Sequence, residues 1–403
     1  MTRASGVLKA PAPLPALLFP YPDQDPFYTQ PGTLSLDKPG TIYKTRLAKN
    51  SGVLFATATQ LLFRTVDALG NPTTSVTTVI KTPTSNMNYL VAYNMYEDAA
   101  WTGCAPSYCF NTVPNVLFCP AGDGNLAQIV SLGYPVVVTD FEGKTSGFSV
   151  GHIAGYQILD GYRAAINFLK MSSNVVIGGF GYSGGAIGTG WSAALHNVYA
   201  PELNIKALAF GGTPANVTET LLSLSGAADA GLAVAGVAGQ AASYPELGAR
   251  FQQVATAKGK ASILQAQSQC TLANLLTLGG TNILSTDFQS LGAGFLTDPI
   301  VAKYLALGNL GSNQTETPTR PQIYMYHSST DNVVPYAGAL KAAQSWCQYG
   351  AKIMFTTRTG GTDHIAAQLL YSPAAITWLD SALKSQTPLI TSCSFVTKDL
   401  FAP

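Results

Sequence analysis

A serine set among glycines is the residue of this sequence best suited to nucleophilic chemistry. A serine hydroxyl is a poor nucleophile, so it must stand on a sharp turn, beside a base and beside backbone N–H groups that can hold an oxyanion. The β-branched stretch 175–179 predicts a buried parallel strand, and the stretch 186–195 predicts a helix of small residues. Between them lies the pentapeptide Gly181-Tyr182-Ser183-Gly184-Gly185. We therefore predict that Ser183 is a nucleophile on a strand-to-helix turn that its flanking glycines permit.

A serine nucleophile needs a histidine to take its proton and a carboxylate to orient that histidine. His364 lies in a predicted loop after the last predicted strand, before an amphipathic helix that runs to about Leu383. Asp331 follows directly after the predicted strand that ends at His327. The chain order Ser183, Asp331, His364 is that of an α/β-hydrolase. We predict these three residues as a catalytic triad.

The other histidines and acids are weaker candidates. We expect His196 to face solvent or pack late in the helix after the serine, and His152 to lie in a glycine-rich loop. His327 could be a packed or hydrogen-bonded residue near the site. Asp363 is a rival acid, but adjacent side chains seldom meet productively, so we interpret it as a loop or N-cap residue. Asp380, late in the last predicted helix, is a weaker rival.

The oxyanion hole of this fold uses the N–H of the residue after the nucleophile and a second donor from the loop after an early strand. The first donor is then Gly184. The stretch 90–95 is that early strand, and Tyr-Glu-Asp-Ala follows at 96–99 without an HGGG loop. We predict the N–H of Asp98 as the second donor.

The elements that must hold these residues alternate along most of the chain. A Pro-rich extended arm is expected over 1–38, followed by a hairpin of 54–65 and 74–81 with its turn at 67–72. Short apolar strands then alternate with helical stretches, which predicts an α/β protein with a mostly parallel sheet flanked by helices. The predicted strands are 90–95, 135–139, 175–179, 207–211, 323–327 and 353–357. The core is expected to comprise 39–212 and 313–403.

The alternation stops over 213–312, where Ala, Leu, Gly and Ser follow a helical period. We predict a helical cap, or lid, inserted over the carboxyl ends of the strands, where open α/β sheets bind ligands. Such a cap would exclude water and shape an acyl pocket. A merely stabilising insertion is the alternative.

Composition excludes several classes of partner. The chain has 403 residues, is 47% hydrophobic and only 11% charged, and its formal net charge is +1. No basic surface is available to follow nucleic acid, and no stretch is long enough for a membrane span. No Gly-Lys-Ser/Thr sequence follows the glycine-rich turn at Ser183, which disfavours a phosphate-binding loop there, and the cysteines have no Cys-x-x-Cys pair or His-rich companion that would favour zinc. We expect no cofactor, no metal, no nucleic acid partner and no integral membrane association.

Cysteines and sequons favour a secreted protein. Six cysteines without a Cys-x-x-Cys pair permit about 15 pairings, which sequence alone cannot choose among. Asn216 and Asn313 begin N-x-Ser/Thr triplets and are predicted glycosylation sites.

Together these residues make the chain resemble the fungal secretory lipase family within the α/β-hydrolase superfamily. The matching segments are DPFYT, YEDA, CAPSY, DFEG, GYSGG with GTGW, YAPEL, DNVVP, WC and DHI. The resemblance implies Ser183, Asp331 and His364 as the triad, and Asp98 and Gly184 as the oxyanion positions. It also implies disulfides between Cys104 and Cys270 and between Cys347 and Cys393. Cys109 and Cys119 are additional and could form a third bridge.

The resemblance implies a serine carboxylic-ester hydrolase, an esterase or lipase, that works through an acyl-serine intermediate. A family lipase continues well beyond the last cysteine and covers its acyl tunnel with that tail, whereas this chain ends at Pro403. We therefore expect a more open site that favours short to medium acyl or acetyl esters. An acyltransferase, a long-chain triacylglycerol lipase and a non-catalytic binding protein remain alternatives. The expected partner of this secreted monomer is a small-molecule or lipid ester, with a lipid interface as an open question.

Overall fold

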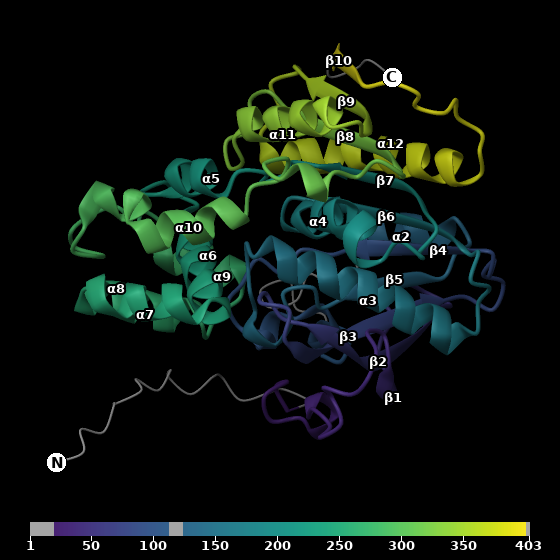
Figure 1. Ribbon diagram of the computed structural model, residues 1–403, viewed down its shortest axis with the longest axis horizontal. Helices are drawn as coiled ribbons and strands as arrows, with labels where there is room; N and C mark the ends of the chain where they lie inside the picture. The colour runs from purple at the N-terminus through teal and green to yellow at the C-terminus, as the bar shows by residue number, and fades with distance from the viewer. Residues whose placement is uncertain (1–19, 113–123, 400–403) are drawn as a thin grey trace.

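Strands that alternate with helices along the chain join into one ten-stranded sheet (Figure 1). The computed structural model describes residues 20–112 and 124–399. The strand order is β1-β2-β3-β5-β4-β6-β7-β8-β9-β10. The strands are β1 (Ile42–Leu47), β2 (Thr57–Val66), β3 (Pro72–Lys81), β4 (Tyr89–Asn94), β5 (Val136–Thr139), β6 (Val176–Tyr182), β7 (Ile205–Gly211), β8 (Gln322–Ser328), β9 (Lys352–Arg358) and β10 (Ser394–Lys398).

The sheet is mostly parallel, as predicted. All neighbouring strands from β5 through β4 to β10 are parallel, while β1, β2 and β3 are antiparallel to one another and β3 is antiparallel to β5. The hairpin predicted around 67–72 is confirmed as β2 and β3. Because the six central strands are buried on both faces, their sequences are apolar runs rather than alternating patterns.

Two edge strands were missing from the predicted set. Within the described parts of the chain, β1 pairs only with β2, and β10 pairs only with β9. Most residues of β10 are exposed, and β1 has no fully buried residue. An edge strand buries too little apolar surface to leave a clear pattern in the sequence, which is why both were missed.

Helices cover both faces of the sheet. One face carries α3 (Gly151–Leu169), α4 (Gly184–Tyr199) and α11 (Tyr336–Gln348), whose apolar residues form one core cluster with the strands. The other face carries α2 (Gly124–Ser131) and α12 (His364–Leu383), which form a second cluster. Shorter helical turns connect these layers: η1 (Pro26–Tyr28), η2 (Thr102–Cys104), α1 (Pro106–Cys109), η3 (Gly143–Thr145) and η5 (Gln314–Glu316).

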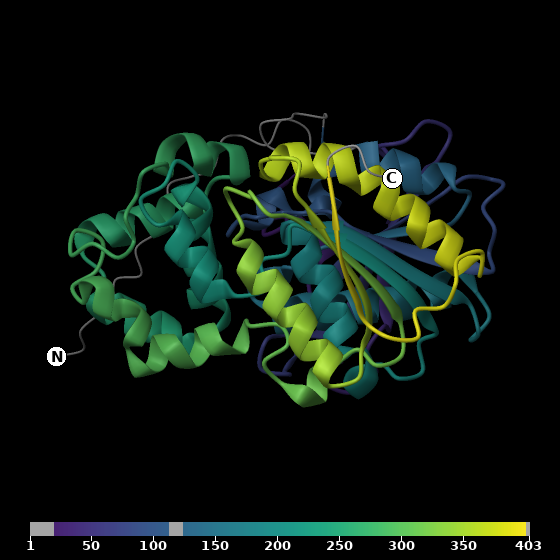
Figure 2. The same cartoon turned by 90° about the horizontal axis from the view of Figure 1, so that it is seen from above.

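Between β7 and β8 the described chain contains helices and no strand of the sheet. These helices lie together beside one end of the sheet in both views (Figures 1 and 2). They have an apolar cluster of their own, to which Phe251, Phe288 and Phe295 contribute. The elements are α5 (Val217–Leu224), α6 (Ala230–Ser243), α7 (Pro245–Val254), α8 (Ala257–Ala266), α9 (Thr271–Leu278), η4 (Gly292–Thr297) and α10 (Pro299–Leu307).

The stretch expected to be a glycine-rich loop around His152 is instead the start of α3. A Cβ at Gly151 would collide with the Trp191 ring, and one at Gly155 would collide with the Trp191 carbonyl. These glycines therefore let α3 approach α4 closely, and they do not break the helix. The prediction was wrong because glycine also serves helix packing.

Half of the predicted N-terminal arm, residues 1–19, lies outside the described residues. The remainder, up to residue 38, contains η1 and several turns. Phe27 is buried there, and Asp25 forms an ion pair with Arg46 of β1 at 2.5 Å. This part of the arm is thus attached to the sheet.

Candidate active site

Ser183 lies on the turn between β6 and α4. Its φ of 56° and ψ of −122° place it outside the helical and strand regions, a strained conformation typical of a nucleophile elbow. The turn is possible because glycines flank it: a Cβ at Gly181 would collide with the Gly185 carbonyl, and one at Gly185 would collide with the Asn94 carbonyl. The sequence pattern therefore does produce the sharp turn that the chemistry needs.

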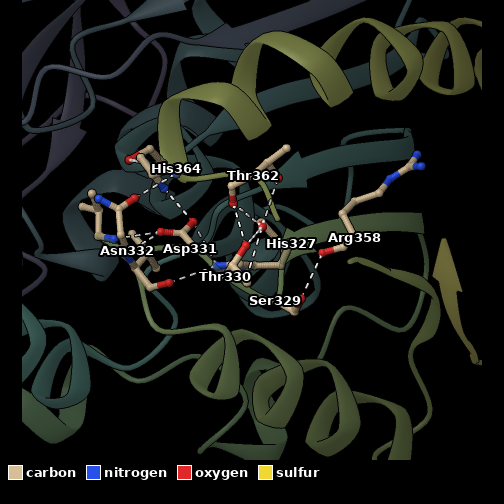
Figure 3. Close-up of polar contacts among 12 residues, drawn as sticks. His327, Ser329, Thr330, Asp331, Asn332, Arg358, Thr362 and His364 are labelled. Carbon is tan, nitrogen blue, oxygen red and sulfur yellow. Dashed lines mark hydrogen bonds and ion pairs between the residues drawn. The ribbon is translucent and has the colours of Figure 1, made fainter. Parts of the chain in front are cut away.

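The structure brings Ser183, His364 and Asp331 together in a hydrogen-bonded chain. His364 Nε2 lies 2.8 Å from Ser183 Oγ. His364 Nδ1 lies 2.7 Å from Asp331 Oδ2 (Figure 3). One imidazole can thus accept a proton from the serine on one side while its other nitrogen donates to a buried carboxylate.

Asp331 is surrounded by hydrogen-bond donors. Its Oδ1 accepts the backbone N–H groups of Val333 at 2.9 Å and Val334 at 2.8 Å. Its Oδ2 faces His364 and also His327, whose Nε2 lies 3.3 Å away. Burial alone would raise the pKa of this carboxyl, but hydrogen bonds from His327 and His364 outweigh burial and hold the pKa well below its usual range. Asp331 is therefore a carboxylate in the folded protein.

The backbone of His364 is fixed by two side chains. The His364 N–H donates to Asn332 Oδ1 at 3.0 Å, and the Tyr182 hydroxyl donates to the His364 carbonyl at 2.8 Å. Asp363 caps α12 by accepting the Ala366 N–H at 2.8 Å, as predicted for an N-cap. His364 is accordingly the first residue of α12 and not a loop residue. Sequence reasoning missed Asn332 as a supporting residue, although it adjoins Asp331.

Two turns that carry the acid and the base are joined to each other. Ser328 and Thr330 donate their hydroxyls to the Thr362 carbonyl, and the Thr362 hydroxyl donates to Ser328 Oγ at 3.1 Å. Ser329 donates its N–H to the Arg358 carbonyl at 2.9 Å. Figure 3 shows these contacts running between the end of β8 and the segment before α12. They hold Asp331 and His364 at a fixed separation.

The weaker candidates lie elsewhere. His152 Nε2 is 3.0 Å from Glu316 Oε1, in η5 before β8. His196 is fully buried, with Nε2 2.8 Å from the Leu203 carbonyl, and burial lowers its pKa. Asp380 accepts the Tyr134 hydroxyl at 2.6 Å. None of these three contacts involves Ser183.

Asp98 lies next to Gly184, but its backbone N–H is already engaged. That N–H donates to Glu142 Oε1 at 3.1 Å, so it can serve as the predicted oxyanion donor only if this hydrogen bond is broken. Its carboxyl packs against Gly184, where a Cβ would collide with Asp98 Oδ1. Burial raises the pKa of Asp98 to about 7, and nearby His364 partly opposes the increase. Because Gly184 is the first residue of α4, its N–H has no partner within the helix.

The loop that carries Asp98 is anchored to the helices between β7 and β8. Thr271, at the start of α9, donates its hydroxyl to the carbonyls of Glu97 at 2.7 Å and Asp98 at 3.2 Å. The adjacent Cys270 forms a disulfide with Cys104. Burial, together with neighbouring carboxylates, raises the pKa of both Glu97 and Glu142 well above the usual value. This loop is therefore held between the sheet and α9.

Comparison with known proteins decides the family. The secretory lipase family model matches residues 121–390. The chain is 36% identical to the secreted triacylglycerol lipase LIP3 of Malassezia restricta, over 89% of this chain and 79% of the relative. It is also 36% identical to LIP2 of Malassezia furfur, over 93% of this chain and 82% of the relative. The chain belongs to the secretory lipase family. The expectations of a carboxylic ester hydrolase and of a secreted protein are thereby confirmed.

Solved structures agree with this assignment. Candida antarctica lipase A in its closed state superposes with a TM-score of 0.85 at 28% identity, covering 93% of this chain and 90% of that one. The fold of this secretory lipase is thus the α/β-hydrolase fold, as predicted. Within the described ranges, no helix has both the length and the apolar character needed to cross a bilayer.

Two cavities of this lipase meet at the serine. The first, of about 50 Å³, is bordered mainly by apolar side chains, including Ile187, Trp191 and Leu221. The second, of about 380 Å³, is bordered by α9 and by the start of α12. Residues common to both are Asp98, Ser183, Leu232 and Val333. An ester bound at Ser183 can therefore extend in two directions of different size.

The cysteines and sequons lie as follows. Disulfides join Cys104 to Cys270 and Cys347 to Cys393, as the resemblance implied. Cys119, the predicted partner of Cys109, lies outside the described residues. Asn216 is the half-buried N-cap of α5, whereas Asn313 is exposed. Over residues 20–112 and 124–399, no group of His, Cys, Asp and Glu side chains is arranged to hold a metal ion.

Proposed function

We propose that Ser183, His364 and Asp331 form a catalytic triad that hydrolyses carboxylic esters through an acyl-serine intermediate. The observation that carries this proposal is the continuous chain from Ser183 Oγ to His364 at 2.8 Å and from His364 to Asp331 at 2.7 Å. These distances are short enough for proton transfer without rearrangement.

The geometry supports the following sequence of steps. Ser183 Oγ bonds to the ester carbonyl carbon while its proton passes to His364 Nε2, and Asp331 stabilises the imidazolium that forms. The tetrahedral intermediate then breaks its bond to the alcohol oxygen, which takes the proton from His364. A water molecule next gives a proton to His364 and attacks the acyl-serine. Release of the acid returns the proton to Ser183 Oγ.

The oxyanion of each tetrahedral intermediate is proposed to lie at the N-terminus of α4. The Gly184 N–H is the first donor, assisted by the positive end of the helix dipole. Asp98 is the proposed second donor. Since its N–H is bound to Glu142, its carboxyl beside Gly184 is the available group. That carboxyl is protonated below a pH of about 7 and can donate its O–H.

Two variants of Asp98 separate these possibilities. Asp98→Asn keeps a donor at this position, whereas Asp98→Ala removes it. We expect Asp98→Ala to lose about 100-fold in kcat, as is typical for one oxyanion donor, and Asp98→Asn to lose much less. Equal losses in both variants would contradict a donor role for the side chain.

We propose that the acyl group enters the smaller cavity and the alcohol enters the larger one. A volume of about 50 Å³ holds about four water-sized groups, because each needs roughly 10–15 Å³ by this measure. The size therefore supports acetyl to short-chain acyl groups. The larger cavity, of about 380 Å³, can accept a bulky alcohol portion. Long-chain triacylglycerols are the alternative, and the Malassezia relatives are named triacylglycerol lipases.

The helical segment 213–312 is the proposed cap over this site. Leu232 of α6 borders both cavities, and Leu272 and Leu275 of α9 border the larger one. These helices thus contribute apolar surface on both sides of Ser183. Such a cap would exclude water and define the size of the acyl group.

The reaction itself is tested by Ser183→Ala, with Ser262→Ala, at a half-buried position of α8 that borders neither cavity, as the matched control. Ser183→Ala should lose at least about 10⁴-fold in kcat toward p-nitrophenyl acetate, and Ser262→Ala should lose nothing. Full activity of Ser183→Ala would overturn the proposal.

Acyl length is tested by a series of p-nitrophenyl esters. The expected optimum is at four carbons or fewer, and an optimum at long chains would contradict the cavity assignment. Leu221 borders both the acyl cavity and a further cavity of about 20 Å³. Leu221→Ala should therefore move the optimum to longer chains. Its neighbour Leu222, which is half-exposed, provides the control Leu222→Ala.

A further inference from the structure

A second histidine contacts the carboxylate of the proposed triad. His327 Nε2 lies 3.3 Å from Asp331 Oδ2, the same oxygen that His364 Nδ1 contacts at 2.7 Å. Both side chains of the His327–Asp331 pair are fully buried. His327 is near the end of β8, and Asp331 lies on the turn that follows (Figure 3). Asp331 therefore contacts two imidazoles, one from β8 and one from α12.

The contacts of His327 determine which of its nitrogens carries the proton. Nε2 faces two acceptors, Asp331 Oδ2 and the Val334 carbonyl at 3.1 Å. It must therefore carry a hydrogen, shared between them. Nδ1 is buried and has no hydrogen-bond partner. A hydrogen on Nδ1 would be a buried donor without an acceptor, so the neutral Nε2–H tautomer is favoured.

We infer that His327 is a positioning residue that sets the basicity of Asp331 toward His364. This inference rests on the proposed function. The His327 N–H withdraws part of the negative charge from Oδ2. Asp331 then stabilises the His364 imidazolium less than an otherwise unpaired oxygen would. The His364 imidazolium therefore loses its proton more easily, and the Asp331 carboxylate is held in one orientation.

Other groups around the pair do not replace this contact. Asp98 faces His364 from the loop after β4, and Asp363 precedes His364 as the N-cap of α12. Tyr182 of β6 is occupied with the His364 carbonyl. The Tyr336 ring of α11 packs edge-on against His327 at 5.9 Å. Among the contacts given above, only the two imidazoles reach Asp331 Oδ2.

Two substitutions test the inference. His327→Met has a similar volume and no donor, whereas His327→Gln can return a side-chain N–H that does not titrate. The readout is the pH profile of kcat/KM for p-nitrophenyl acetate. In His327→Met the midpoint of the acid limb should move to higher pH by about half a unit to one unit, the size expected for one lost hydrogen bond. In His327→Gln it should return toward the wild-type position.

A purely structural role predicts a different result. It would lower activity or thermal stability in both variants without moving the acid limb, and that result overturns the inference. Should His327→Met fail to fold, His327→Leu, which also lacks a donor, takes its place: a limb displaced to higher pH supports the inference, and an unmoved limb refutes it. If wild-type protein has neither an acid limb nor a Ser183 that reacts with a phosphonate ester, it is the proposed function that has failed.

Discussion

Removing the disulfide between Cys104 and Cys270 should reduce both stability and catalysis, whereas removing the other described disulfide should reduce stability alone. The first bond joins the segment that follows the Asp98 loop to the start of α9, over a separation of 166 residues. The second joins α11 to the segment before β10, over 46 residues. Only the first lies beside the proposed oxyanion donor.

The magnitudes follow from the lengths of the closed loops. In the chain-entropy model, a loop of 166 residues contributes about 5 kcal/mol to the free energy of unfolding at 25 °C, and one of 46 residues contributes about 4 kcal/mol. The two losses of stability should therefore be similar. The catalytic losses should differ, because a mispositioned donor costs up to about 100-fold in kcat. The Thr271 hydroxyl remains as a second anchor, so we expect a loss of about tenfold.

The assay compares two double variants, Cys104→Ala with Cys270→Ala and Cys347→Ala with Cys393→Ala. Denaturant unfolding measures the stability of each, and kcat for p-nitrophenyl acetate is measured well below both midpoints. Active-site titration with a phosphonate corrects for unreactive protein. The reasoning is refuted if the first variant keeps its full kcat, or if the second loses as much kcat as the first.

Three further predictions address the acid, the buried carboxyls and the sequons. Asp331→Asn should lower kcat by about 10⁴-fold with little change in fold, because the amide favours the wrong imidazole tautomer; circular dichroism and steady-state kinetics check both parts. The protein should melt at a higher temperature at pH 5 than at pH 8, and Asp140→Asn should reduce that difference by roughly 2 °C or more, as measured by scanning calorimetry. In a eukaryotic secretion host, Asn313→Gln should remove a glycan detectable by mass spectrometry. Asn216→Gln should remove none, since Asn216 is half-buried and caps α5.

The pH dependence follows from buried carboxyls. Burial raises the pKa of Asp140 from 3.8 to about 7, although Ser107 donates to it. Between these pH values the unfolded carboxyl has lost its proton while the folded one keeps it, so stability falls as pH rises. Asp98 behaves alike. Because the pKa of Asp331 is lowered, its contribution to stability is lost only below about pH 4, as the pH falls. His196, with a lowered pKa, opposes the trend, and a flat melting profile would contradict it.

The positions of the central strands along the chain and the three residues of the proposed triad could be predicted because local patterns carry them. Central strands are continuous apolar runs, and a nucleophile, an acid and a base are each expected at the end of one such run. Ser183 follows β6 directly, Asp331 lies on the turn after β8, and His364 begins the helix that follows β9. The position of each residue relative to a strand end was therefore enough to select it.

The supporting contacts could not be predicted, because they join distant parts of the chain. Glu142 accepts a hydrogen bond from the Asp98 N–H, although the two residues are 44 positions apart in the sequence. No sequence pattern links them. His327 was expected only to pack or hydrogen bond near the site. Its contact with Asp331 Oδ2, the oxygen that His364 also contacts, depends on the shape of the turn after β8. The helix at Gly151 was missed because its glycine is required by Trp191, a residue on another helix.

The central claim is that Ser183 is the nucleophile, and covalent labelling tests it most directly. The protein is incubated with a p-nitrophenyl phosphonate ester carrying a short alkyl chain, and the modified peptide is located by mass spectrometry. We predict one phosphonyl group per chain on Ser183, with labelling abolished in Ser183→Ala and strongly slowed in His364→Gln. Labelling of another residue, or unchanged labelling in Ser183→Ala, would contradict the account.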